Sequence, residues 1–185
     1  MQKKIFIWAI FIFLAAAGPG FGEAEKLDLD FKLSSPKDPV QLEYLGLDRA
    51  ESFSLDQVRA DILIVEIFSM YCPVCQREAK NINALFDRIR QKKELNRRVK
   101  LIGIGAGNSE FEVAFFKENY GIQFPLFSDS DFTIHKKIGE VRTPFFIGLE
   151  LKKEGFHVFF THAGEIKNHE GFLEEILSAS GLDFK

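Results

Sequence analysis

Residues 62–75 read ILIVEIFSMYCPVC. The first half is a nearly continuous apolar run with many β-branched side chains, which predicts a strand buried on both faces. Both cysteines of the chain follow directly, as Cys72 and Cys75 of one C-x-x-C motif. Apolar side chains then recur at helical spacing up to about Lys93: Val74, Ala79, Ile82, Leu85, Phe86 and Ile89. The sequence therefore predicts a buried strand, a cysteine pair and a helix, in that order.

The rest of the chain completes a mixed α/β pattern. Residues 99–104 form a second apolar strand, which we expect to lie parallel to the first across a right-handed crossover. Further elements are predicted along the chain: helices at 110–119 and 130–137 with an extended piece at 123–127 between them, antiparallel strands at 145–151 and 156–161, and an amphipathic helix around 172–177. We expect a mixed central β-sheet flanked by helices.

The chain divides into three parts. Residues 1–24 have the order of a secretory signal, and residues 42–185 form the main domain. Between them, residues 25–41 are expected to form an N-terminal β extension. Alternating apolar and polar residues predict one strand at 27–33, and a second strand is expected at 40–45.

The signal assignment depends on charge and length. Lys3 and Lys4 precede an uncharged apolar run from Ile5 to Ala17, which residues 18–20 (Gly-Pro-Gly) end. The run is shorter than the roughly 20 residues that a spanning helix needs. An uncleaved membrane anchor is the alternative. Export to an oxidising, periplasmic or other extracytoplasmic compartment is the expectation.

Composition narrows the function classes. The fractions of hydrophobic residues (46%) and charged residues (28%) are those of a globular domain and exclude a mainly disordered chain. The net charge of −3 comes without a basic stripe, so the sequence predicts no nucleic-acid partner.

The spacing of the two cysteines favours redox chemistry. At a helix N-terminus Cys72 is stabilised as a thiolate, and Pro73 suits the first helical position because it needs no N–H partner there. Cys75 lies about one turn on, close enough to resolve a mixed disulfide. A structural disulfide over so short a loop would constrain little of the unfolded chain, and zinc would need further ligands that the sequence lacks. No metal is expected.

Two further positions attract attention. Glu66 interrupts the apolar strand six residues before Cys72. If buried, its pKa should rise, and it could pass protons to Cys75; an outward-facing position at a sheet edge is the alternative. Thr143-Pro144 directly precedes a predicted strand, which indicates a tight bend. A cis peptide there would leave the Thr143 backbone free to pair with an incoming peptide.

Residues 64–75, with Tyr71, Pro73 and Val74 around the cysteines, resemble the active-site strand and motif of the thioredoxin superfamily. Residues 99–104, 111–120, 124–126 and 141–144 are similar to its TlpA/ResA-like branch, and the resemblance covers roughly residues 42–180.

The resemblance implies a thioredoxin fold with an insert between the second and third core strands. It also implies that Glu66 is a buried proton carrier and that Thr143-Pro144 is a cis-Pro loop that binds substrate backbone. The implied activity is disulfide exchange with protein thiols and disulfides, without a cofactor. A membrane or periplasmic redox partner would recharge the pair.

Three alternatives stay open. The Pro73-Val74 dipeptide matches neither thioredoxin (Gly-Pro) nor the oxidant DsbA (Pro-His), so a DsbA-like oxidant competes with the preferred reductant. A peroxiredoxin-like thiol peroxidase would use Cys72 with Ser69 and Arg142. A Cu(I) chaperone would bind metal through the cysteines with His135 or Met70.

Export predicts that the first 22 to 24 residues are removed, because cleavage of a secretory signal follows a small-x-small pattern such as Gly20-Phe21-Gly22 or Gly22-Glu23-Ala24. Intact-mass analysis of the protein from its native host measures this. Full-length protein in the membrane fraction would support the anchor, and full-length protein in the cytosol would contradict both.

Overall fold

The computed structural model describes residues 27–184, so the predicted signal segment lies outside the described residues. Its centre is a five-stranded sheet with the strand order β5-β4-β3-β6-β7. The strands have these bounds: β3 Ile62–Phe68, β4 Val99–Ala106, β5 Leu126–Asp129, β6 Phe145–Lys152 and β7 Gly155–Ala163. Strand β3 pairs parallel with β4 and antiparallel with β6, which makes the sheet mixed, as predicted.

Strand β3 is the middle of the sheet, and every residue of it is buried. Side chains alternate between two cores. Ile62, Ile64 and Phe68 belong to one core, and Leu63, Val65 and Ile67 belong to the other. This two-sided burial explains the unbroken apolar run in the sequence.

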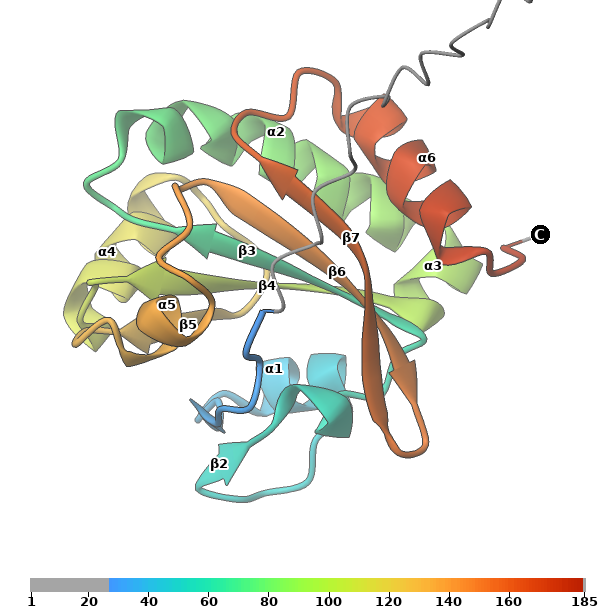
Figure 1. Cartoon of the computed structure of the whole chain (residues 1–185), viewed down its shortest axis with the longest axis horizontal. Coiled ribbons are helices and arrows are strands. Elements are labelled where there is room, and N and C mark those ends of the chain that lie inside the picture. Colours follow the sequence, from blue (N-terminus) through green and yellow to red (C-terminus); the bar gives the residue numbers. More distant parts are fainter. Residues whose placement is uncertain (1–26, 185) are drawn as a thin grey trace, which may run out of the picture.

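Helices cover one face of the sheet. The core on this face includes side chains from α2, α3, α4 and α6. Figure 1 shows α2 and α6 lying together above the sheet, with α4 and α5 at the end where β3 delivers the chain into α2. The helices have these bounds: α2 Pro73–Gln91, α3 Lys93–Arg98, α4 Glu110–Asn119, α5 Thr133–Lys137 and α6 His169–Ser180.

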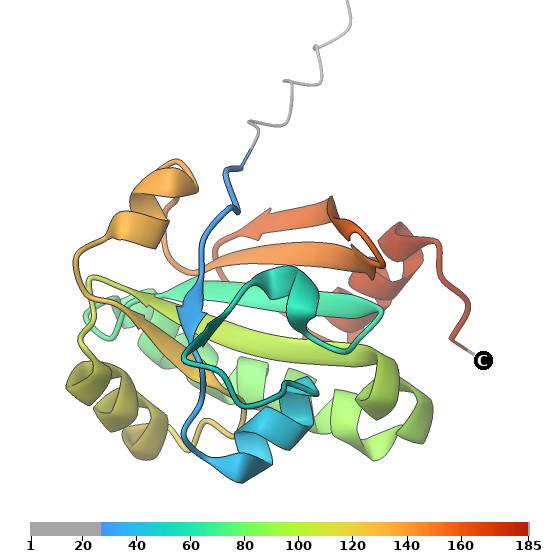
Figure 2. The same ribbon diagram turned by 90° about the horizontal axis from the view of Figure 1, so that it is seen from below.

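The other face is covered by the N-terminal segment, as Figure 2 shows. Leu29, Leu33 and Phe53 pack there with Ile134 of α5 and Ile138, which follows that helix. The N-terminal extension therefore shares a core with the sheet.

Both strands expected in the N-terminal extension differ from the structure. The strand expected at 27–33 is limited to β1 (Leu33–Ser34), which pairs with β2 (Ser52–Phe53). The strand expected at 40–45 is instead a helix, α1 (Pro39–Leu45). Asp38 caps this helix by accepting a hydrogen bond from Val40 N at 2.9 Å, and Gly46 ends it in the left-handed conformation, with φ of 65°. These local caps override the weak strand propensity of the segment.

The insert between β4 and β6 consists of α4, β5 and α5. Strand β5 adds an edge strand parallel to β4, and α5 leads the chain to Thr143. In the described part of the chain, no helix is both long and apolar enough to cross a bilayer.

Candidate active site

The two cysteines occupy the start of α2. Cys72 is its N-cap, Pro73 is at the first helical position, and Cys75 lies in the first turn. Cys72 is partly exposed, whereas Cys75 is 1% exposed. The N–H of Cys75 donates to Cys72 Sγ at 3.3 Å, so the otherwise unpaired helix N-terminus points at this sulfur.

The pKa values of the two thiols move in opposite directions. Burial raises the pKa of Cys72, but hydrogen bonds from the Thr143 side chain, the Cys75 thiol and the N–H groups of Cys75 and Val74 outweigh it and hold the pKa below its usual value. Burial raises the pKa of Cys75 well above its usual value. Cys72 is therefore the thiol that ionises, and Cys75 keeps its proton.

Glu66 lies beneath this pair. Its side chain is 3% exposed, and the alternation along β3 places it on the face that α2 covers, with Ile64 and Phe68. Burial, followed by the negative charges of Glu78 and Cys72, raises the pKa of Glu66 to about 8. The charge of Glu66 in turn contributes to the raised pKa of Cys75. The carboxyl group therefore holds a proton near neutral pH, close enough to Cys75 to interact with it electrostatically.

The Thr143–Pro144 peptide bond is cis. In the protonated form, Cys72 Sγ donates a hydrogen bond to the Thr143 carbonyl oxygen at 3.4 Å. This contact joins residues 71 positions apart. It arises because β3 and β6 are antiparallel neighbours, with Ile67 opposite Phe145, so the chain leaves and re-enters the sheet at one end.

Tyr71, Pro73 and Val74 surround the pair. Tyr71 is 65% exposed, and its hydroxyl donates to the Glu112 carboxylate on α4. The N–H of Val74 is one of the groups that stabilise the Cys72 thiolate. All eight predicted site residues thus lie in the redox loop and the start of α2, in the strand that leads to them, or in the facing Thr143–Pro144 loop.

Sequence reasoning missed the side chains that hold this loop. Asn108 is fully buried and accepts from Met70 N at 2.8 Å, while Gln76 donates to Met70 O at 2.7 Å. Both backbone groups of Met70 are therefore fixed by side chains. No spacing signal marks Asn108, because its partner lies 38 positions away.

Glu78 was also missed. It is 2% exposed, and its carboxylate accepts from Asn81 Nδ2 at 2.7 Å and from the N–H of Ile166. The available signal was a charged residue on the buried face of α2, three positions after Cys75. Its charge also contributes to the raised pKa of Glu66.

The residues of the alternative functions are only partly assembled. Ser69 and Arg142 line a hollow beside Cys72, but no cationic group contributes to the lowered pKa of Cys72. His135 Nε2 is hydrogen-bonded to Val141 O at 2.8 Å. Over residues 27–184, no group of three or more His, Cys, Asp or Glu side chains could hold a metal ion.

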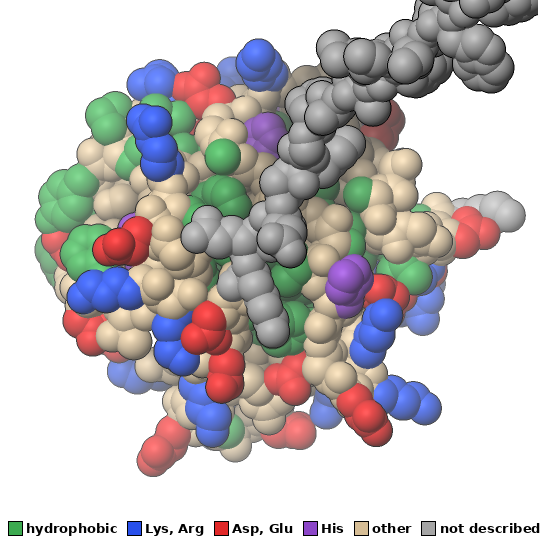
Figure 3. Space-filling view, in the orientation of Figure 1, with side chains coloured by type: hydrophobic (Ala, Val, Ile, Leu, Met, Phe, Trp, Pro, Cys, Tyr) green, Lys and Arg blue, Asp and Glu red, His purple; other side chains and the backbone are tan. Residues whose placement is uncertain are grey.

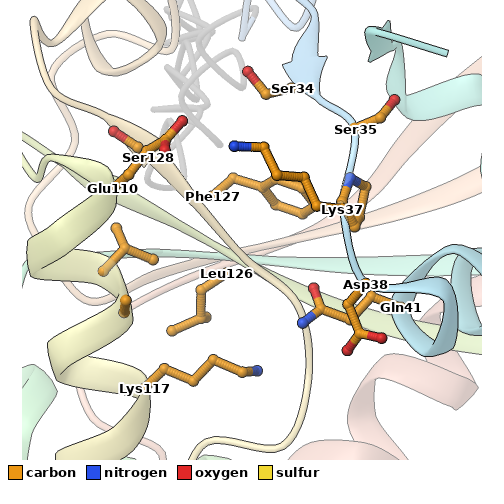
Figure 4. Close-up of a pocket in the computed structure, with 13 residues that line it drawn as sticks. Ser34, Ser35, Lys37, Asp38, Gln41, Glu110, Lys117, Leu126, Phe127 and Ser128 are labelled. Carbon is orange, nitrogen blue, oxygen red and sulfur yellow. The ribbon is translucent and has the colours of Figure 1, made fainter.

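A second cavity, of about 340 Å³, lies between the N-terminal segment and α4 (Figure 4). Asp38 and Glu110 line it together with Lys37 and Lys117, so its charges are mixed. The Lys117 amino group donates to the Phe124 carbonyl. None of the predicted site residues lines this cavity.

Residues 30–174 match the model of the AhpC/TSA family, and the chain belongs to this family. Among curated proteins, it is similar to the thiol-disulfide oxidoreductase ResA of Halalkalibacterium halodurans, at 25% identity over 84 residues. The match covers 45% of each protein, so the chain spans less than half the length of this relative.

Two solved structures share the fold. A secreted Mycobacterium tuberculosis disulfide oxidoreductase homologous to Escherichia coli DsbE matches with a TM-score of 0.58 and 14% identity, over 82% of this chain and 97% of that one. StoA from Bacillus subtilis matches with a TM-score of 0.53 and 22% identity, over 69% and 90%. The chain has the thioredoxin fold.

The buried carboxyl group predicts a pH-dependent stability. The pKa of Glu66 rises from an ordinary 4.5 to about 8 on folding. Between pH 4.5 and about pH 8, the folded chain therefore keeps a proton on Glu66 that the unfolded chain has released. This contribution to stability is complete below about pH 4.5 and is lost as the pH rises through about 8, with a slope of at most about 1.4 kcal/mol per pH unit. Glu66→Gln should flatten the decline.

Urea denaturation of the reduced protein at pH 5, 6, 7 and 8 measures the effect. Glu118→Gln, which changes an exposed acid on α4, is the matched control and should follow the wild type. Parallel declines in the wild type and Glu66→Gln would contradict the assignment.

Proposed function

We propose that this protein is an exported thiol–disulfide oxidoreductase that exchanges disulfides with protein substrates through Cys72 and Cys75. The observation that carries the proposal is the asymmetry of the pair. One thiol is accessible, capped by helix N–H groups and has a lowered pKa, whereas the other lies in the same turn, buried and protonated. Disulfide exchange needs this combination of an attacking thiolate and a resolving thiol.

The reaction follows from this arrangement. The Cys72 thiolate attacks one sulfur of a substrate disulfide, which forms a mixed disulfide and releases the other sulfur as a thiolate that takes up a proton. Formation of the mixed disulfide removes the Cys72 charge, which is one of the charges that hold the proton on Glu66, so Glu66 releases this proton to solvent and, once ionised, accepts the proton of Cys75. The Cys75 thiolate then attacks Cys72 Sγ, so the mixed disulfide breaks and the second substrate thiolate leaves. Two electrons pass to the substrate, and the protein is left with a Cys72–Cys75 disulfide.

The Thr143 backbone is proposed to hold the substrate during this exchange. Its carbonyl already contacts Cys72 Sγ, and its N–H has no hydrogen-bond partner within residues 27–184. An extended substrate segment can satisfy both groups, as a neighbouring strand would. Pro144 fixes the adjacent bend and starts the chain into β6.

Reduction of substrates is the preferred direction, with a DsbA-like oxidant as the alternative. A strong oxidant owes its potential to a heavily stabilised reduced form. Here the two residues between the cysteines are Pro73 and Val74, so no histidine adds to the stabilisation of the thiolate. A periplasmic or membrane-bound thiol donor would return electrons to the pair. No cofactor is required.

The proposed direction of electron transfer predicts the reduction potential of the cysteine pair. The reduction potential of the Cys72–Cys75 couple should lie near the thioredoxin end of the scale, at about −270 mV. Equilibration with glutathione or dithiothreitol, followed by alkylation and mass analysis, measures it. A value near about −120 mV would reverse the proposed direction and leave the exchange chemistry intact.

The different roles of the two cysteines, one attacking and one resolving, predict different behaviour for the variants Cys75→Ser and Cys72→Ser. Cys75→Ser should still attack and then stall, because nothing resolves the disulfide between Cys72 and its substrate. Cys72→Ser should trap nothing, because the remaining thiol is buried and protonated. Non-reducing gels and mass spectrometry of complexes formed in the native compartment measure both.

Accumulation of mixed disulfides in Cys72→Ser would reverse the assignment. A wild type that neither reduces nor oxidises any model disulfide, but consumes hydrogen peroxide, would replace the proposal by the thiol-peroxidase alternative.

A further inference from the structure

The hollow beside Cys72 has a volume of about 540 Å³. Three elements meet around it: the redox loop through Ser69 and Tyr71, the end of β4 through Gly107, and the segment that leads from α5 to Thr143. Phe132 and Val141 contribute apolar walls. The hollow is also lined by Thr143, whose carbonyl oxygen lies 3.4 Å from Cys72 Sγ, so it adjoins the sulfur that a substrate must reach.

Phe132 is held in place by its surroundings. It adopts a left-handed backbone conformation, with φ of 60°, which is unusual for a bulky residue, and its side chain is still 44% exposed. Its ring fills the space beside Gly107, where an added Cβ would lie 2.1 Å from the ring. The absence of a side chain at Gly107 thus allows the ring to form a wall of the hollow.

The same segment holds a second unusual residue. Glu140, which also lines the hollow, has φ of 53°. Its N–H donates to the carbonyl of His135 at 2.9 Å, and the His135 ring bonds to Val141 O. Over residues 27–184, Phe132 and Glu140 are the non-glycine residues with positive φ, and both line this hollow. Such conformations cluster at sites that bind.

The geometry of the mixed disulfide determines which part of a substrate lies over the hollow. The Cα atoms of two linked cysteines are usually about 5.5–6 Å apart, so the substrate backbone must pass close to Cys72 and Thr143. In an extended segment alternate side chains share a face. When the substrate cysteine points at Cys72, the residue two positions away, about 7 Å along the strand, points the same way.

We propose that the hollow receives a large apolar side chain located two residues from the cysteine of an extended substrate polypeptide. Tyr71, Phe132 and Val141 offer it aromatic and aliphatic contacts, and the volume admits the largest side chains. Glu140 and Arg142 carry opposite charges on the lining, so neither sign of charge is favoured. The inference rests on the proposed function and names the substrate class of that site.

Phe111 offers a matched control. Figure 3 shows exposed hydrophobic side chains gathered at the edge of the molecule where α4 and α5 lie. Phe111 on α4 is 77% exposed but does not line the hollow. Its removal changes the exposed aromatic surface without changing the proposed pocket.

Rates of reduction of disulfide-linked peptides test the proposal. The cysteine is flanked by Gly and Ser, and the position two residues away, on either side, is Phe, Leu, Ala, Asp or Lys. On one side, the wild type should prefer Phe over Ala in kcat/KM by about tenfold or more, because burying the ring in the hollow stabilises the transition state. The preference should fall below about threefold in Phe132→Ala and persist in Phe132→Tyr and Phe111→Ala.

A second measurement does not depend on the folding of Phe132→Ala. The Cys75→Ser variant, trapped with the Phe peptide, should show nuclear Overhauser effects between the peptide ring and Phe132. Contacts between the ring and residues outside the hollow would contradict the proposal.

A failure of this inference can be distinguished from a failure of the proposed function. Reaction with the small disulfide DTNB should be equal in wild type and Phe111→Ala, which shows that the thiols are intact. Equal rates for all peptides, or a preference for Asp or Lys, would overturn the inference and leave the proposed function standing. No reaction with any peptide or with DTNB would overturn both.

Discussion

The position of one strand determines the rest of this structure. Strand β3 is in the middle of the sheet and buried on both faces, so its side chains alternate between two cores. A carboxyl group at position 66 therefore lies under α2 and away from water. The same strand then delivers Cys72 to the N-terminus of α2, where the N–H groups point at its sulfur. Opposite pKa shifts in two nearby thiols follow from this geometry.

Those opposite shifts come from different physical sources. Hydrogen bonds stabilise the charged form of Cys72, and loss of solvation destabilises the charged form of Cys75. Glu66 is subject to the second effect and also to the charges of Glu78 and Cys72. Ionisation of Cys72 thus makes proton release from Glu66 harder, so the three groups titrate as a coupled set.

Much of the fold could be predicted because its signals are local. The apolar run of β3, the cysteine motif and the Ser109 cap of α4 each specify their own element. Helix α1 was not predicted, although Asp38, Pro39 and Gly46 mark its ends, because its residues also alternate between apolar and polar side chains as a strand would. The buried roles of Asn108 and Glu78 depend on contacts with Met70 and Ile166, which only the folded chain brings near.

The antiparallel pairing of β3 and β6 has an evolutionary consequence. It places the redox loop and the Thr143 loop at the same end of the sheet, whatever the chain does between them. Exposed positions of α4, β5 and α5 can therefore change over generations, while buried side chains such as Phe116 stay in the core and the sulfur and the backbone facing it keep their separation. The proposed exchange chemistry depends on the two paired strands, whereas the proposed preference for a substrate side chain depends in part on Phe132 and Val141 around α5, so selection can change the preference without rebuilding the reaction.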